Sequence, residues 1–220
     1  MLRLLYFVVG LLDTNTYLVY DEETRDAVVI DPGGEVNELI NWIERLNLNL
    51  RAILATHGHF DHVWGVDDLK SHYNAPFYMH HLDVEIARTS MSWVKLWGVK
   101  PKEAPTPDHT IANDQVLRIG SIDIVAIHTP GHTPGSTCFY IPRLGALFSG
   151  DTLFAGTVGR TDLPGGSSED LMKSLAKIFR RLPLDTFVYP GHGPSTTLRR
   201  ELRANIYVED ALRIYGELKS

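Results

Sequence analysis

The sequence predicts a layered α/β domain built from two similar halves. In each half, short apolar runs that fit buried strands come before segments whose apolar residues recur at helical spacing. Four of these runs lead into Gly-rich loops that carry histidine or aspartate. No repeat, linker or low-complexity tract divides the chain, so we expect one domain over residues 1–220.

The first half begins with a predicted β-meander. Its strands lie near 2–9, 16–20 and 27–30, and Asp31-Pro32-Gly33-Gly34 ends the third of them. The spacing of apolar residues then predicts a helix over 36–46. Further along we expect a buried strand at 52–55, a helix near 64–73, a strand at 76–79 and a helix near 83–88.

Residues 89–109 interrupt this alternation. They contain Trp93 and Trp97, and three prolines follow, which predicts a long, partly ordered loop. Two tryptophans in such a loop fill a satellite core, cover an active site, or contact another subunit. A homo-oligomer is therefore left open.

The second half returns to strands and ends in helices. Gly-bearing turns separate the predicted strands, and Ser167 or Ser168 is placed to cap the helix that follows them. The remainder of the chain after the last strand is expected to be helical to its end. The predicted strands are 115–119, 122–127, 136–141, 146–149 and 186–189, and the predicted helix covers 170–182.

Composition and charge narrow the class of protein. Hydrophobic residues at 44% and charged residues at 22% fit an ordinary globular chain. A net charge of −6 disfavours nucleic acid and anionic membranes as partners. The partner that we expect is a small-molecule substrate, for the reasons given below. The apolar segment 1–12 is too short to span a bilayer and is not followed by a signal-peptide cleavage site. Because Cys138 is the only cysteine, an internal disulfide is impossible. We expect a cytoplasmic protein.

The clearest functional signal is a run of four possible ligands directly after the apolar run 52–55. His57, His59, Asp61 and His62 fall within six positions. On a helix His57 and His59 would point about 200° apart, so a loop around a bound ion explains the pattern better than a regular element. Imidazole and carboxylate are ligands for zinc and other first-row transition metals.

Three later segments share this design of an apolar strand and a Gly-rich loop carrying one donor. The donors are His132, Asp151 and His192. Seven donors exceed what one tetrahedral zinc ion uses, and they suit two metal ions that share a bridging carboxylate. The five other histidines are expected to lie on the surface or in the core, although two of them follow a strand end and are the best placed to line a pocket (His80 and His81, against His72, His109 and His128).

These residues together resemble the metallo-β-lactamase superfamily and, within it, the short single-domain glyoxalase II-like hydrolases. The similarity extends from Leu11–Tyr17 through Asp31-Pro32-Gly33 to Pro190–Pro194. It implies a four-layer αββα sandwich with the metals at one edge of the two sheets. It also implies a first metal site of His57, His59 and His132, a second of Asp61, His62 and His192, and Asp151 bridging the two.

The resemblance also implies a reaction. A bound metal ion lowers the pKa of its water from about 15.7 to about 7, so no protein base is needed to form hydroxide. Hydroxide between the metals would attack a carbonyl carbon, and Asp61 would help to orient it. The expected substrates are thioesters, with S-lactoylglutathione first among them. Two divalent metal ions are expected, zinc first, with iron or manganese as alternatives.

Two departures from glyoxalase II bear on the substrate. Only 28 residues follow His192, which leaves no room for the C-terminal domain that holds glutathione there. Where those enzymes carry a lysine and a tyrosine, this chain has Gly159-Arg160-Thr161-Asp162. Arg160 either binds a substrate carboxylate or forms a structural ion pair with Asp162.

Other members of the superfamily supply alternative functions. Persulfide dioxygenases share a segment like 159–162, and that resemblance implies one iron held by His57, His132 and Asp151. A β-lactamase is disfavoured by the bridging aspartate and by the lack of a secretory signal. A metal-binding module without turnover is the non-enzymatic alternative.

Overall fold

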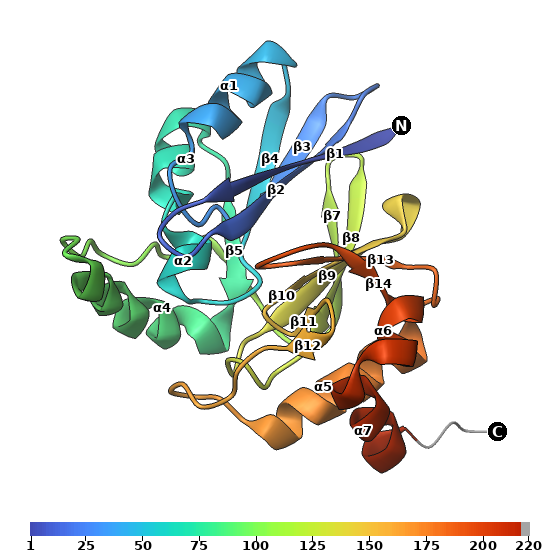
Figure 1. The fold of residues 1–220 in the computed structure, drawn as a ribbon. Coiled ribbons are helices and arrows are strands. Elements are labelled where there is room, and N and C mark those ends of the chain that lie inside the picture. The colour runs from blue at the N-terminus through green and yellow to red at the C-terminus, as the bar shows by residue number, and fades with distance from the viewer. Residues whose placement is uncertain (217–220) are drawn as a thin grey trace.

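Two six-stranded sheets face each other across the centre of the molecule, and helices cover the outer face of each (Figure 1). The computed structural model describes residues 1–216. The strand order is β1-β2-β3-β4-β5-β6 in the first sheet and β14-β13-β10-β9-β8-β7 in the second. The predicted αββα sandwich is confirmed.

The first sheet begins as an antiparallel meander and continues with parallel strands. Strands β1, β2 and β3 pair antiparallel, whereas β3, β4, β5 and β6 run parallel to one another. Parallel neighbours need crossover connections, which the helices of this half supply. The elements are β1 (Leu2–Val9), β2 (Thr14–Asp21), β3 (Asp26–Ile30), α1 (Asn37–Arg45), β4 (Asn49–Leu54), α2 (Phe60–Val63), α3 (Val66–Tyr73), β5 (Phe77–His80), α4 (Val84–Ser90) and β6 (His109–Ile111).

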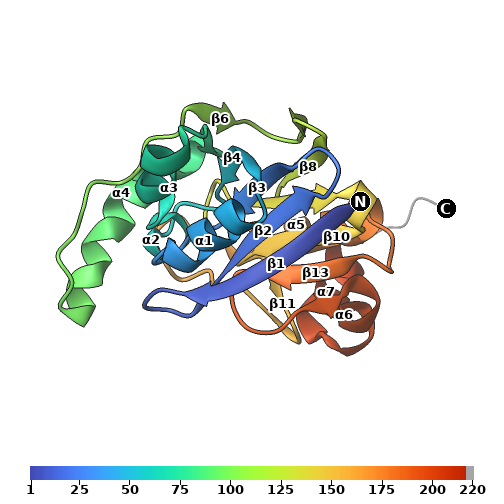
Figure 2. The ribbon, with the colours of Figure 1, turned by 90° about the horizontal axis from the view of Figure 1, so that it is seen from above.

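The second sheet is antiparallel from β7 to β10, and β13 then joins β10 in parallel after the crossover through α5. Helix α4 and the helices α6 and α7 lie at opposite ends of the molecule (Figure 1, Figure 2). The elements are β7 (Gln115–Ile119), β8 (Ile122–His128), β9 (Thr137–Ile141), β10 (Ala146–Gly150), β11 (Leu153–Phe154), β12 (Thr157–Val158), α5 (Ser168–Arg181), β13 (Phe187–Pro190), β14 (Thr196–Thr197), α6 (Leu198–Ala204) and α7 (Ile206–Tyr215).

Alternating side chains along the strands produce three layers of packing. In β2, Leu18 packs with residues of α1 and α3, while its neighbour Val19 lies between the two sheets. In β10, Phe148 lies between the sheets and Leu147 packs with residues of α5 and α7. Because successive side chains of a strand point to opposite faces, each central strand supports both an inner and an outer layer.

Most predicted elements are present, and the differences concern short ones. Ser167 caps α5 by accepting a hydrogen bond from the backbone N–H of Asp170 at 3.2 Å, as expected. Within the predicted loop 89–109, Met91–Trp97 form a 3-10 helix, and β6 starts at the loop's end. Strands β6, β11, β12 and β14 have three residues or fewer, too few to show a periodic pattern. The helical ending that we expected is present as α6 and α7, although the short strand β14 precedes them. Residues 217–220 lie outside the described part of the chain.

The apolar N-terminal segment is part of the sheet. Leu2–Val9 form β1, which pairs with β2 along its whole length, so the prediction of two strands joined by a turn is confirmed. Among residues 1–216, no helix combines the length and the apolar character that crossing a membrane requires.

Candidate metal centre

All seven predicted ligands lie together at one edge of the sandwich. His57 and His59 are in the loop after β4, and the short helix α2 directly after that loop carries Asp61 and His62. The other three follow the second sheet's strands β8, β10 and β13. The structure therefore brings the seven predicted residues together (His57, His59, Asp61, His62, His132, Asp151 and His192).

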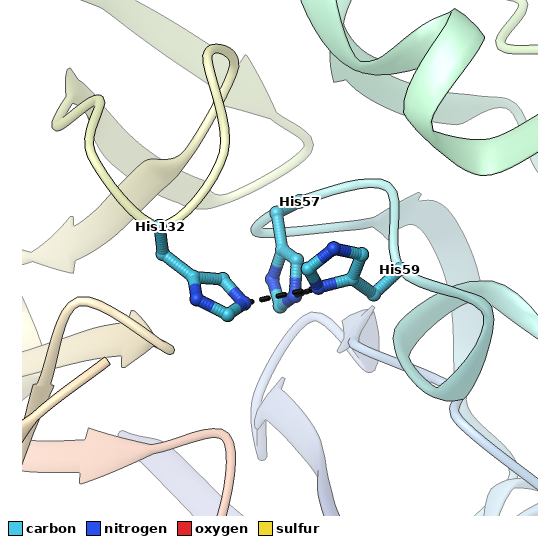
Figure 3. Close-up of side chains that lie close together, drawn as sticks. All are labelled: His57, His59 and His132. Carbon is cyan, nitrogen blue, oxygen red and sulfur yellow. Dashed lines mark hydrogen bonds between the residues drawn. The ribbon is translucent and has the colours of Figure 1, made fainter. Parts of the chain in front are cut away.

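The first group consists of three buried histidines whose ring nitrogens converge. Nδ1 of His59 lies 3.0 Å from Nε2 of His57 and 3.0 Å from Nε2 of His132 (Figure 3). The rings come from two different loops, and Figure 3 shows that they point toward a common centre. Three imidazole nitrogens arranged in this way are a ligand set for zinc or a related ion.

The second group combines one carboxylate with two histidines. Oδ2 of Asp61 lies 3.4 Å from Nε2 of His62 and 3.2 Å from Nε2 of His192. The two histidine nitrogens are 3.3 Å apart. This group has the composition that the resemblance implied for a second metal site.

Asp151 lies between the two groups. Its Oδ2 is 3.5 Å from Nε2 of His132 in the first group and 3.6 Å from Nε2 of His192 in the second. Its Oδ1 is 3.4 Å from Nε2 of His62. One carboxylate thus reaches both groups, which is the position of a bridging ligand.

The chemistry of the first group fits a bound cation. Burial, reinforced by the neighbouring histidines, holds the pKa of His57 well below its usual range and lowers that of His59 to about 3. These two rings are therefore neutral, and a neutral imidazole has a nitrogen lone pair that can bind a cation. Oδ1 of Asp151 is also buried without a hydrogen-bond donor, and such an atom is costly to leave unpaired.

The second group also attracts positive charge. Burial opposes protonation of His62, but the surrounding carboxylates, led by Asp61 and Asp31, outweigh it and raise the pKa of His62 to about 10. Burial likewise favours a neutral Asp61, yet the adjacent histidines hold the pKa of this carboxyl below its usual value. A cation at this position is therefore stabilised, whether a proton or a metal ion supplies the charge.

Asp31 and Thr56 orient two of the ligands. Asp31 Oδ2 lies 2.9 Å from Nδ1 of His62 and accepts a 2.7 Å hydrogen bond from the Thr56 hydroxyl. That hydroxyl is also 3.1 Å from Nδ1 of His57. Contacts at Nδ1 leave Nε2 of both rings free to face the metal positions. The sequence marked Asp31 as the end of a strand and gave no signal of this role.

Backbone carbonyls orient the other two Nε2 ligands. Nδ1 of His132 is 2.8 Å from the carbonyl oxygen of Arg160, and Nδ1 of His192 is 3.0 Å from that of Leu12. Each ring donates to its carbonyl and presents Nε2 to the centre. Both halves of the chain therefore hold the ligands.

Asp83 ties two ligand loops together and was not predicted. It is fully buried, and it accepts hydrogen bonds from the N–H of Gly58 at 2.8 Å, the N–H of Gly135 at 2.6 Å and the Thr133 hydroxyl at 2.7 Å. Gly58 lies between His57 and His59, and Thr133 follows His132. One carboxylate thus fixes the spacing of the first group.

Gly191 shows why glycine is needed beside the ligands. A Cβ atom at this position would lie 2.3 Å from Oδ1 of Asp151 and 2.6 Å from Cε1 of His62. Contacts this short do not occur, so any side chain here would displace Asp151 and His62. The glycine preceding His192 is therefore a steric requirement of the centre.

A cavity of about 600 Å³ opens above the two groups. Arg160 lines it, and its guanidinium donates to Asp162 through Nε at 2.7 Å and Nη2 at 2.8 Å. Trp93 and Trp97 also line it, so the tryptophan segment covers the ligand groups. The ring centre of Trp93 is 5.2 Å from that of His59.

The other histidines lie elsewhere, as expected. His80 is buried and stacks on His128 at 4.3 Å and on His81 at 4.6 Å between ring centres. Neither His80 nor His81 lines the cavity above the ligands, and that they line another pocket stays a prediction. His72 is paired with Glu44 at 3.0 Å on the surface.

Comparisons with known proteins agree with this geometry. Residues 9–192 match the family model described as the metallo-beta-lactamase superfamily. A protein of Aquifex aeolicus is 38% identical over 206 residues, which cover 93% of this chain and 96% of that protein. Hydroxyacylglutathione hydrolase GloC of Haemophilus influenzae is 35% identical over 88% of this chain and 92% of its own length.

Solved structures are similar over nearly the whole chain. BLEG-1 B3 metallo-beta-lactamase has a TM-score of 0.85 and 36% identity, with 94% of this chain and 99% of that one covered. TTHA1623 in a di-iron-bound form has a TM-score of 0.81 and 39% identity, with 91% and 98% covered. ETHE1 from Myxococcus xanthus has a TM-score of 0.76 and 27% identity, with 100% and 92% covered.

Proposed function

The chain belongs to the metallo-β-lactamase superfamily, and within it we propose a metal-dependent hydrolase of thioesters, similar in activity to glyoxalase II. The observation that carries this proposal is the pair of complete ligand groups joined by Asp151 beneath an open cavity. The similarity to hydroxyacylglutathione hydrolase GloC supports a thioester as the substrate.

Each ligand group has a role in the proposed reaction. His57, His59 and His132 would hold one divalent ion, and the group around Asp61 would hold the other. Bound ions of this kind supply a water of lowered pKa and a Lewis acid for the carbonyl oxygen. Hydrolysis joins the oxygen of water to the thioester carbonyl carbon and breaks the C–S bond, which releases a carboxylic acid and a thiol.

Asp61 is the chain's proposed catalytic residue. It lines the cavity, and its Oδ2 accepts a hydrogen bond from the Thr14 hydroxyl at 3.1 Å, which fixes the orientation of the carboxylate. Because the pKa of Asp61 lies below its usual value, the group is ionised at neutral pH and able to accept a hydrogen bond from the attacking water.

Zinc is the metal that we propose first. Histidine and carboxylate donors also suit iron and manganese, and TTHA1623 is described in a di-iron-bound form. The donor set alone does not choose among these ions, so metal content and activity need to be measured on the same sample.

The experiment that tests the proposal is a substrate panel on protein whose metals have been quantified. We expect hydrolysis of S-lactoylglutathione or another acyl thioester, with loss of activity after chelation and recovery on adding metal. A β-lactam belongs in the panel because of the similarity to BLEG-1. Full metal content without hydrolysis of any thioester would contradict the proposal and favour a metal-binding module.

A persulfide dioxygenase is the second candidate. It is favoured by the position of segment 159–162, whose Arg160 carbonyl lies 2.8 Å from Nδ1 of His132, and by the structural similarity to ETHE1. A site for one iron would not need the group of Asp61, His62 and His192. The presence of this second group therefore favours the hydrolase. One iron per chain, with sulfite and thiol formed from glutathione persulfide, oxygen and water, would reverse this preference.

A further inference from the structure

We propose that the cavity selects thioesters with an uncharged apolar arm over thioesters of a charged peptide such as glutathione. The inference rests on the proposed thioester hydrolysis and specifies its substrate class. Three features of the cavity carry it. The first is an apolar wall, and the second is the buried support of that wall. The third is the ion pair of Arg160 with Asp162, because Arg160 is, among residues 1–216, the one charged lining side chain that is not a proposed metal ligand.

The apolar wall is formed by Trp93, Leu96 and Trp97 of the 3-10 helix Met91–Trp97. Leu96 is 82% exposed and Trp97 is 46% exposed, although both are large apolar side chains. Leu12 and Leu163 also line the cavity. Contiguous exposed apolar side chains beside a reactive centre mark a binding surface for an apolar group.

The wall is held in place by buried neighbours. Met91 and Val94, from the same 3-10 helix, are buried in the core of the first half of the chain. The ring centre of Trp97 is 6.0 Å from that of Phe60, which lies between the ligands His59 and Asp61. The wall is thus anchored both to the core and to the metal loop.

The cavity is also large enough for more than the reacting group. At about 600 Å³ it lies within the range of about 300–1,000 Å³ that is usual for small-molecule sites. Its floor is formed by the ligands, including His59, Asp61 and Asp151. A thioester whose carbonyl group lies on this floor has its thiol arm against the apolar wall.

The charge around the cavity disfavours an anionic arm. Among the lining residues that the structure describes, Arg160 is the one charged side chain outside the two ligand groups. Its guanidinium is held by both carboxylate oxygens of Asp162, so no uncompensated cation is offered. A glutathione arm would have to displace Asp162 or place its carboxylates over Leu96 and the tryptophans, which costs solvation free energy.

The test compares substrates that differ in one arm at a time. The probes are S-lactoylglutathione, the lactoyl thioester of benzyl mercaptan, and S-phenylacetylglutathione, each corrected for its rate of hydrolysis by hydroxide. Metal-loaded wild-type protein should have a kcat/KM about tenfold or more higher for the lactoyl thioester of benzyl mercaptan than for either glutathione thioester. A smaller preference than this, or a preference for a glutathione thioester, would overturn the inference.

Variants at Leu96 place the effect on the wall. Leu96→Ala should lower kcat/KM for the preferred apolar substrate about fivefold and leave that for S-lactoylglutathione within about twofold. Leu82→Ala is the matched control, because Leu82 is 46% exposed and does not line the cavity. Equal effects of Leu96→Ala and Leu82→Ala would contradict the assignment. Failure of metal-loaded protein to hydrolyse all three probes would refute the proposed function itself.

Discussion

At the scale of single residues, Asp151 has the central position. Its two oxygens lie 3.4–3.6 Å from histidines of both ligand groups, and it also lies together with His57 and His62, one histidine from each group. Gly191 leaves the space that this carboxylate occupies. A change at Asp151 therefore affects both proposed metal ions, and changes elsewhere affect mainly one.

Replacing Asp151 with alanine should remove metal and activity together. We expect Asp151→Ala to lower kcat/KM for a thioester by about 10³-fold or more, because the shared ligand is lost. Elemental analysis should show less metal per chain, and circular dichroism should show a retained fold. Asp185→Ala, at an exposed carboxylate paired with Arg199, is the control and should change neither quantity. Wild-type metal content in Asp151→Ala would contradict the bridging role.

Replacing Arg160 and replacing Asp162 should change KM for anionic substrates in opposite directions. Arg160→Ala should raise KM for S-lactoylglutathione severalfold and change kcat less, because it leaves the Asp162 carboxylate unpaired beside the anionic arm. Asp162→Asn frees the guanidinium from its two hydrogen bonds and should lower the same KM. Steady-state kinetics of both variants test this pair of effects. An unchanged KM in both would remove Arg160 from the substrate site.

The sequence predicted the ligands better than the residues that orient them. The four ligands from His57 to His62 can be recognised in the sequence because four donors in six positions fit no regular element. Asp31 and Asp83 act on partners 25 or more residues away, Asp31 on Thr56 and His62 and Asp83 on Gly58 and Thr133, so nothing in their local sequence indicates the role. Such residues become visible only when the fold brings their partners together.

At the scale of elements, the centre depends on connections between ligand loops and the helices beside them. Asp83, directly before α4, bonds to the loop of the first half and to the loop after β8 in the second half. Strands with clear alternation and helices with clear periodicity were predicted. The short strands β6 and β14 were not, because they exist through pairing with β5 and β13.

Removing the Asp83 carboxylate should destabilise the fold. Asp83→Ala leaves the buried N–H groups of Gly58 and Gly135 without their acceptor, and we expect a loss of about 3 kcal/mol in the free energy of unfolding. Asp83→Asn keeps one acceptor oxygen and should lose less. Denaturant unfolding of the metal-loaded protein measures both. An unchanged free energy of unfolding in Asp83→Ala would show that these hydrogen bonds do not support the loops.

At the scale of the whole molecule, the two sheets place four loops at one edge, and the charged and apolar parts of the cavity come from both halves. Stability depends on pH through residues outside the two ligand groups as well. Burial lowers the pKa of His80 from 6.5 to about 4, with His128 and His81 adding to the effect. The unfolded chain therefore binds a proton at this residue more readily than the folded protein does.

The contribution of His80 to stability should be complete above pH 6.5 and should be lost as the pH falls toward 4. Because the unfolded state binds more protons in this window, the free energy of unfolding rises with pH there, by up to about 3 kcal/mol. His80→Phe keeps a ring in the stack and cannot titrate. The difference in unfolding free energy between wild type and His80→Phe should slope between pH 4 and 6.5. A flat difference would contradict a neutral, buried His80.

Titration of metal-depleted protein with zinc or manganese, followed by thioester hydrolysis at each addition, tests the central claim most directly. The two ligand groups joined by Asp151 predict that activity rises until about two equivalents of metal per chain are bound and then reaches a plateau. If activity reached its plateau at one equivalent and a second equivalent left it unchanged, the two-metal hydrolase would be contradicted.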